Sequence, residues 1–146
     1  MTASAEGTLR VGVDVVAVAD VAASVRRFGD RYVQRIFTPH EIDSCLNPVG
    51  RDPGVATYAT ASLAARFAAK EAVVKVLRPP EARPEWRSIE VHRTAGGWCE
   101  IRLSGQAAEL AAAAGIDGFA VSLTHEEPIA AAVVVCRCDA GWPGEE

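Results

Sequence analysis

The sequence predicts an α+β fold: a single small domain in which an antiparallel sheet packs on a long central helix. The first observation is an apolar helical run over residues 58–77, which Pro79 and Pro80 stop. The second is two pairs of strand-like segments joined by short turns, at 88–103 and 119–136. The third is the length of 146 residues, which suits one hydrophobic core.

The first predicted element is a strand. The stretch LRVGVDVVAV, residues 9–18, alternates between two faces, as a strand does. Gly12 and Asp14 share one face with Arg10. The other face carries Leu9, Val11, Val13 and Val15.

Helices are expected next. Segment 20–28 is predicted to be helical and to end at Gly29, with a short helix over 30–37 after it. The tetrapeptide TPHE, residues 38–41, starts another helix, with a capping threonine, a proline in the first helical position and a glutamate that completes a capping box. The segment NPVGRDPG, residues 47–54, is predicted to be a loop.

The second half of the chain is predicted to contain two hairpins and a helix. SIEVHR and WCEIRL flank TAGG as one hairpin, and FAVSLTH and IAAAVVVC, joined by EEP, form another. Between them, residues 104–115 form an amphipathic helix closed by Gly115. We expect loose tails at 1–8 and 139–146 around a domain at 9–138.

Composition excludes several classes of protein. The net charge of −4 argues against nucleic-acid binding through a basic face. No apolar run reaches the roughly twenty residues of a membrane helix, and no basic segment followed by a hydrophobic one opens the chain. The four cysteines form no CxxC pair, so we expect reduced thiols rather than a metal site, and a cytoplasmic protein.

The central helix, SLAARFAAKEAVVKVL at 62–77, carries more charge than its packing predicts. Arg66, Lys70, Glu71 and Lys75 interrupt an otherwise apolar segment, and burying them unpaired would cost several kcal/mol. Glu71 and Lys75 can pair with each other at i, i+4. Arg66 and Lys70 then lack an acidic partner on this helix, so the alternative is an anionic ligand with a cation near the carboxylate.

Asp14 favours the ligand interpretation. A carboxylate inside an apolar strand is unusual, and Gly12 before it permits close approach of another backbone. Two carboxylates from separate elements, with lysines nearby, fit a Mg²⁺ ion that shares its coordination with a phosphate. The alternative for Asp14 is a cap at a strand end.

These residues resemble a known family. VGVDVV at 11–16 and ARFAAKEAVVK at 65–75 resemble the G-x-D and (R)F-x-x-K-E-A-x-x-K motifs of the small, holo-acyl-carrier-protein-synthase type of 4′-phosphopantetheinyl transferase. RFGDRYVQRIFTPHEI at 27–42 and VSLTHEEPIAAAVVV at 121–135 extend the likeness over residues 9–136. The resemblance implies that family's fold, and transfer of phosphopantetheine from coenzyme A to a serine of an apo acyl carrier protein, with release of adenosine 3′,5′-bisphosphate.

The resemblance also implies roles for residues. Asp14 and Glu71 would hold Mg²⁺, and Lys75 would neutralise or protonate the leaving phosphate. The group that takes the serine proton is left open. Lys70 would line the site or brace the carboxylates, and His125 could instead be a turn histidine bonded to backbone. Contacts to coenzyme A are expected from Arg66, Lys70, Lys75, Thr124 and His125.

Partners follow from the same resemblance. The basic run would dock an acidic carrier protein, although it could also be a solvated helix face; it comprises Arg26, Arg27, Arg31 and Arg35. Family members assemble as homotrimers with sites between subunits. Two departures stand out: residues 78–86 lack the family's glycine-rich loop, and Asp20 occupies a position where an arginine is frequent. The reversed charge indicates either a changed carrier preference, for a polyketide-type over a fatty-acid carrier, or a shifted contact that uses Arg26 or Arg27.

Two other functions remain open at this point. One is a different Mg²⁺-dependent enzyme, a phosphohydrolase acting on nucleotides or coenzyme A. The other is a non-catalytic binding module that retains the family fold. The second would require lost site residues, whereas Asp14, Lys70, Glu71 and Lys75 are all present.

Overall fold

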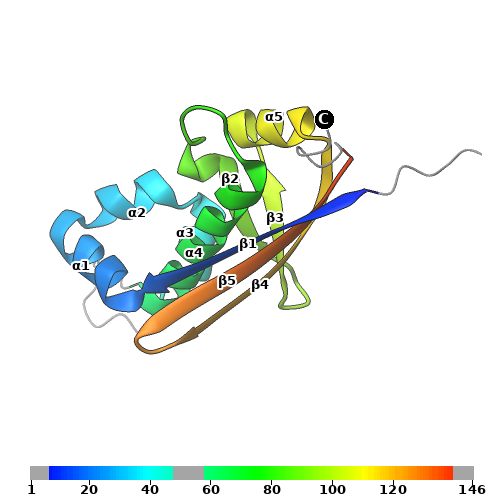
Figure 1. Cartoon of the computed structure of the whole chain (residues 1–146). Helices are drawn as coiled ribbons and strands as arrows, with labels where there is room; N and C mark the ends of the chain where they lie inside the picture. The colour runs from blue at the N-terminus through cyan, green and yellow to red at the C-terminus, as the bar shows by residue number, and fades with distance from the viewer. Residues whose placement is uncertain (1–6, 48–57, 140–146) are drawn as a thin grey trace, which may run out of the picture.

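The computed structural model describes residues 7–47 and 58–139 and confirms the α+β class, with helices gathered on one side of an antiparallel sheet (Figure 1). A three-stranded sheet has the order β1-β5-β4, and a two-stranded sheet pairs β2 with β3. The strands are β1 (Thr8–Ala17), β2 (Ile89–Arg93), β3 (Cys99–Leu103), β4 (Ile116–Glu126) and β5 (Ile129–Cys138). The helices are α1 (Val18–Phe28), α2 (Asp30–Ile36), α3 (Pro39–Ser44), α4 (Thr60–Leu77) and α5 (Gly105–Ala113), with a short 3₁₀ helix η1 (Trp86–Ser88).

Helix α4 is the central element of the fold. It crosses one face of the three-stranded sheet, with α1 to α3 near the end of the sheet where β1 finishes and α5 near the opposite end (Figure 1). Buried positions fall on most sides of α4, from Leu63 to Leu77, because the sheet, the small hairpin and α1 all pack on it. The predicted long central helix is therefore confirmed, although it begins at Thr60 rather than at residue 58.

Gly12 lets β1 approach the α4 backbone. A Cβ atom at this position would lie 2.3 Å from the Ala72 carbonyl oxygen, a distance that no side chain tolerates. The close backbone approach expected at Gly12 is confirmed, and the approaching backbone is that of α4. Asp14, two residues along the same strand face, is thereby carried to the side of the helix.

The outer face of the large sheet is apolar along β1 and uncovered in the single chain. Strand β1 alternates as predicted, but its apolar face points away from α4. Its four side chains are 54–65% exposed: Leu9, Val11, Val13 and Val15. In the central strand β5, Val133 belongs to the same face, since it pairs with Val13 and is also exposed.

The local signals in the sequence are largely confirmed. Thr38 and Glu41 form the predicted capping box, with reciprocal bonds of 2.9 Å from the Thr38 amide to Glu41 Oε1 and 3.3 Å from the Glu41 amide to Thr38 Oγ1. Gly115 follows α5 with a φ of 67°. Helix α1 begins two residues before its predicted start and β4 three, at Val18 and Ile116.

Some expectations fall outside the described residues. These are most of the predicted loop at 47–54 and of the tails at 1–8 and 139–146, so the proposed domain limits of 9–138 stay a prediction. Among the helices that the structure describes, none combines the length and the apolar character needed to cross a membrane.

Candidate active site

The crossing of β1 and α4 brings Asp14, Glu71 and Lys75 together. The Lys75 ammonium lies 3.3 Å from Asp14 Oδ1 and donates a 2.7 Å hydrogen bond to the Val13 carbonyl. The Asp14 and Lys75 side chains are 20% and 53% exposed, so this pair faces solvent at the edge of the helix–sheet contact. Lys75 thus pairs with Asp14 of β1 rather than with Glu71 at i, i+4, the pairing that the sequence also allowed.

Glu71 lies beside this pair. Its carboxyl pKa is raised, first by burial and then by the negative charge of Asp14, while Arg83 and Lys75 act in the opposite direction. Because the charge of Asp14 acts on the Glu71 carboxyl, the two carboxylates lie near each other although they belong to separate elements. This is where the sequence predicted a metal ion.

Arg83 is a site residue that the sequence reasoning missed. Its Nη1 lies 3.5 Å from Glu71 Oε1, and its guanidinium stacks over the Trp86 ring at 4.6 Å from the centroid. Arg83 belongs to residues 78–86, the segment that lacks the family's glycine-rich loop and for which the resemblance implies no contacts with coenzyme A. The one signal available was an arginine in a proline-bounded loop that returns toward the charged helix.

The donor set suits Mg²⁺. Among residues 7–47 and 58–139, no group of three or more His, Cys, Asp or Glu side chains could enclose a metal ion. Magnesium does not need such a cage, because it keeps several waters and is typically bound through one or two carboxylates plus substrate phosphates. Asp14 and Glu71 provide those two carboxylates, and both remain partly open to solvent.

Lys70, expected from the resemblance to contact coenzyme A, belongs instead to the core. Its ammonium is fully buried and has three acceptors: Glu41 Oε1 at 2.7 Å, the Trp86 carbonyl at 3.0 Å and the Ile89 carbonyl. All three donors are therefore used inside the core, and none is left for coenzyme A. The acidic partner that seemed to be missing on α4 is supplied by α3. Burial lowers the pKa of Lys70, and Glu41 beside it opposes that shift.

Arg66 is buried but incompletely bonded. The residue is 5% exposed, its Nη1 donates 3.2 Å to the Ser62 carbonyl, and its Nε has no partner among the described atoms. An unsatisfied buried donor costs roughly 1–3 kcal/mol, more for a charged group, so a further acceptor for this guanidinium would be stabilising. Its expected contact with coenzyme A remains a prediction.

Thr124 and His125 do not converge with Asp14 in the single chain. Both are exposed near the end of β4, and β5 separates β4 from β1, which places the two outer strands about 10 Å apart. Thr124 pairs with Ala131, which puts it on the apolar outer face opposite Asp14. His125 pairs with Ala130 at the hairpin end, on the inner face.

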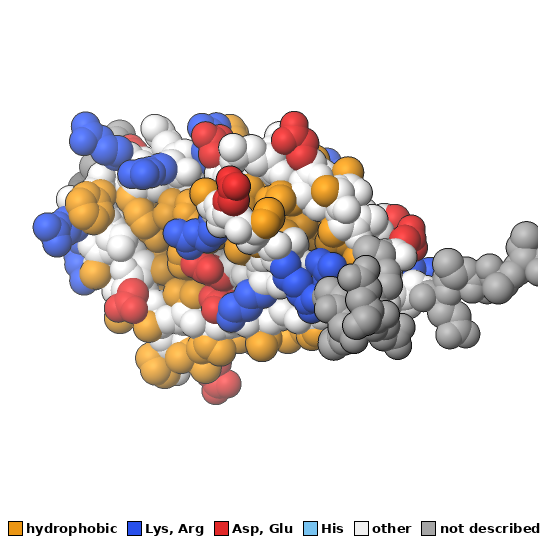
Figure 2. Space-filling model, turned by 45° about the horizontal axis from the view of Figure 1, so that its top comes forward, with side chains coloured by type: hydrophobic (Ala, Val, Ile, Leu, Met, Phe, Trp, Pro, Cys, Tyr) orange, Lys and Arg blue, Asp and Glu red, His pale blue; other side chains and the backbone are white. Residues whose placement is uncertain are grey.

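The basic residues of α1 and α2 lie on the surface. Figure 2 shows Lys and Arg side chains gathered at the end of the molecule that these helices form, with acidic and basic side chains side by side nearer the middle. Each of the predicted docking arginines is exposed: Arg26 and Arg27 in the last turn of α1, and Arg31 and Arg35 on α2. Their exposure is compatible with docking and does not test it.

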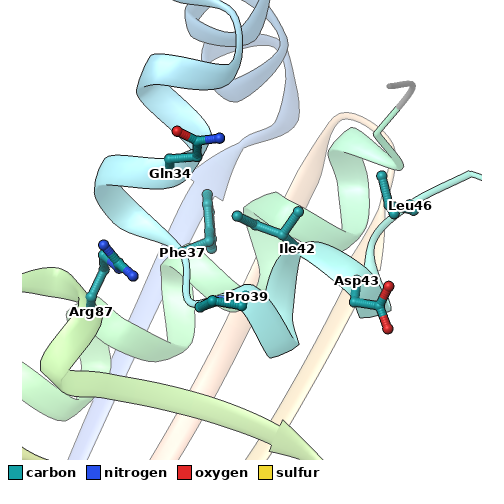
Figure 3. Close-up of a pocket in the computed structure, with 7 residues that line it drawn as sticks. All are labelled: Gln34, Phe37, Pro39, Ile42, Asp43, Leu46 and Arg87. Atoms are coloured by element: carbon teal, nitrogen blue, oxygen red, sulfur yellow. The ribbon is translucent and has the colours of Figure 1, made fainter. Parts of the chain in front are cut away.

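A separate hollow of about 380 Å³ lies beside α2 and α3 (Figure 3). Its walls are mainly apolar, with Phe37, Pro39, Ile42 and Leu46 between Gln34, Asp43 and Arg87. None of the predicted catalytic or metal-binding residues lines it.

Comparison with known proteins agrees with this geometry. A family model described as the 4′-phosphopantetheinyl transferase superfamily matches residues 10–133. The chain therefore belongs to the 4′-phosphopantetheinyl transferase superfamily, and the predicted resemblance, enzyme class and fold are confirmed.

Within the superfamily, the chain is similar to holo-[acyl-carrier-protein] synthases. The one from Moorella thermoacetica is 39% identical over 87% of this chain and 92% of its own length. The one from Chloroflexus aurantiacus is 42% identical over 91% and 97%. Among solved structures, a Chronobacterium ammoniagenes synthase in complex with coenzyme A matches with a TM-score of 0.74 and 29% identity, covering 90% of this chain and 98% of that one.

Proposed function

We propose that this chain transfers the 4′-phosphopantetheine group of coenzyme A to a serine of an apo acyl carrier protein, with release of adenosine 3′,5′-bisphosphate. The observation that supports it most is the meeting of Asp14, Glu71 and Lys75 at the β1–α4 crossing, in a chain whose residues 10–133 match the family model. That charge arrangement suits the transfer of a phosphoryl group, where catalysis is mostly positioning and electrostatic stabilisation.

Asp14 and Glu71 would hold Mg²⁺ together with waters and the pyrophosphate of coenzyme A. The ion would neutralise phosphate charge as the serine oxygen attacks. Lys75 is anchored by the Val13 carbonyl and keeps a half-exposed ammonium beside Asp14. From that position it would neutralise the leaving phosphate or donate a proton to it.

The reaction product tests this proposal. Coenzyme A, Mg²⁺ and several apo carrier proteins are incubated with the protein, and each carrier is weighed by mass spectrometry. We expect the mass of one phosphopantetheine to be added to a carrier. A phosphohydrolase would instead release free phosphopantetheine and leave every carrier unmodified, which would refute the transferase.

We further propose a homotrimer with active sites between subunits. The exposed apolar face of β1 and β5 supports it, because a contiguous uncovered patch of this kind is typical of an interaction surface. The separation of Thr124 and His125 from Asp14 supports the trimer too. In a trimer, these two residues of one copy could contact coenzyme A bound at Asp14 of a neighbouring copy. Sedimentation equilibrium should give three times the protomer mass, and Val13→Asp should lower it; a monomeric wild type would contradict the trimer.

The docking surface and the carrier preference remain parts of the proposal. Exposed arginines on α1 and α2 would steer an acidic carrier, so the Michaelis constant for the carrier should rise with salt, and less so after replacement of Arg27 and Arg31. Asp20 is exposed in the first turn of α1 and would weaken docking of a strongly acidic fatty-acid carrier relative to a polyketide-type one. Equal kcat/KM on both carriers would refute this preference.

The four free thiols favour a cytoplasmic location.

A further inference from the structure

A strongly basic pocket lies between α2 and η1, next to the carboxylates of the site. It has a volume of about 450 Å³ and is lined by Arg35, Arg83, Pro84, Glu85, Trp86 and Arg87. Three arginines and one glutamate thus line the pocket. Of the residues that the structure describes, no acidic side chain forms an ion pair with Arg35 or Arg87, so the pocket keeps a positive surplus.

The wall of this pocket is held in place by several contacts. The Trp86 ring packs against Phe67 of α4 at 5.2 Å between centroids, and its carbonyl accepts a hydrogen bond from Lys70. The Glu85 amide donates 3.1 Å to Gln106 Oε1, and the Glu85 carbonyl accepts from Ser88. The backbone that carries Arg83 and Arg87 is thereby tied to both α4 and α5, which fixes the wall of the pocket.

Arg83 connects the pocket to the reaction centre. The same guanidinium lines the pocket, stacks on Trp86 and contacts Glu71 at 3.5 Å. Glu71 is one of the two carboxylates proposed to hold the Mg²⁺ ion, which would also bind the pyrophosphate. Through Arg83 the pocket therefore adjoins one of the two carboxylates of the proposed reaction centre.

We propose that this pocket receives a carboxylate side chain of the carrier protein from the neighbourhood of its acceptor serine, which rests on the proposed transferase function. Guanidinium groups bind carboxylates with paired, charge-assisted hydrogen bonds, which sets orientation as well as proximity. Arg35 continues the exposed basic surface of α2 into the pocket, so a carrier steered by that surface reaches the pocket with the serine facing Glu71. Arg83 and Arg87 thus act as docking residues in a segment without the family's glycine-rich loop.

Steady-state kinetics of Arg87→Ala and Arg35→Ala test the pocket, with the Michaelis constants for carrier and for coenzyme A measured separately. We expect each variant to raise KM for the carrier about fivefold or more, with KM for coenzyme A unchanged and with partial recovery in Arg87→Lys. Arg102→Ala is the matched charge control, because this exposed β3 arginine does not line the pocket. Gln34→Ala controls for the hollow of Figure 3, which Arg87 also borders.

Two results would overturn the inference. One is an unchanged KM for the carrier in variants whose melting shows them to be folded. The other is a rise in KM for coenzyme A alone, which would assign the pocket to a cofactor phosphate. Calorimetric titration of apo carrier protein into wild type and Arg87→Ala, without coenzyme A, keeps the test separate from the activity. A wild type that transfers nothing refutes the function, whereas equal carrier affinity in both proteins refutes the pocket.

Discussion

Breaking the buried Glu41–Lys70 pair by removing one partner should strongly destabilise the fold. Both side chains are fully buried, and their charged atoms lie 2.7 Å apart. Glu41 also accepts 2.9 Å hydrogen bonds from the Thr38 and Val91 amides, so a single carboxylate joins the start of α3, the centre of β2 and the middle of α4. Removing one partner leaves an uncompensated charge inside the core.

Lys70→Met isolates this effect, because it keeps much of the volume and deletes the charge. Glu41 would lose its cation, and the Trp86 and Ile89 carbonyls would lose a donor. Breaking a buried pair in this way costs about 3–5 kcal/mol, out of a total free energy of unfolding of roughly 5–15 kcal/mol. We therefore expect the free energy of unfolding of Lys70→Met to be lower than that of the wild type by about 3–5 kcal/mol.

Chemical denaturation followed by tryptophan fluorescence measures this cost, with protomer concentration held constant in case the chain assembles. Lys75→Met is the control, since its half-exposed ammonium should contribute less than about 1 kcal/mol. Glu41→Gln combined with Lys70→Met removes both charges and should cost less than the sum of the single changes, by about 1–3 kcal/mol. A loss below 1 kcal/mol for Lys70→Met, or a strictly additive cycle, would refute the reasoning.

Two further predictions concern the β1–α4 crossing. Gly12→Ala would place a Cβ 2.3 Å from the Ala72 carbonyl oxygen, so strand and helix must separate; we expect a loss of about 1–3 kcal/mol in denaturation and a lower kcat, and unchanged values would contradict the close-approach argument. Burial and Asp14 raise the pKa of Glu71. The ionised carboxylate therefore destabilises the folded state, and this destabilisation disappears as the pH falls through the raised pKa. As the pH is lowered, Mg²⁺ binding measured by calorimetry should begin to weaken at a higher pH than it would for a glutamate of ordinary pKa. Without metal, Glu71→Gln should have a melting temperature no lower than that of the wild type, and a lower one would contradict the expected destabilisation by the ionised carboxylate.

The sequence predicted the local features of the fold better than the long-range ones. The capping box of Thr38 and Glu41 was readable because its two residues lie three apart. Nothing local indicated that the same Glu41 also binds Lys70, because that contact depends on how α3 packs against α4. Charge counting along α4 correctly identified cations without a partner on that helix. For Lys70 it wrongly inferred an external ligand, because the partner lay on another element.

Strand β1 shows the same limit. Alternation identified the strand and its two faces, but hydrophobicity alone would have turned the valines toward the core. The structure turns Gly12 and Asp14 inward instead, because only a glycine allows the α4 backbone to come so close. Arg83 could not be placed from sequence, since its contact with Glu71 depends on the path of an irregular loop.

Asp14 and Glu71 together are proposed to form the metal site of a phosphopantetheinyl transferase. The measurement that tests this is the mass shift of an apo carrier protein incubated with the Asp14→Asn or Glu71→Gln enzyme. Glu100→Gln, a change at an exposed residue of β3, is the control. We expect the wild type and the control to add phosphopantetheine, while both site variants stay folded and lose transfer by at least about a hundredfold. Near-normal turnover in either site variant would show that its carboxylate does not hold the metal ion.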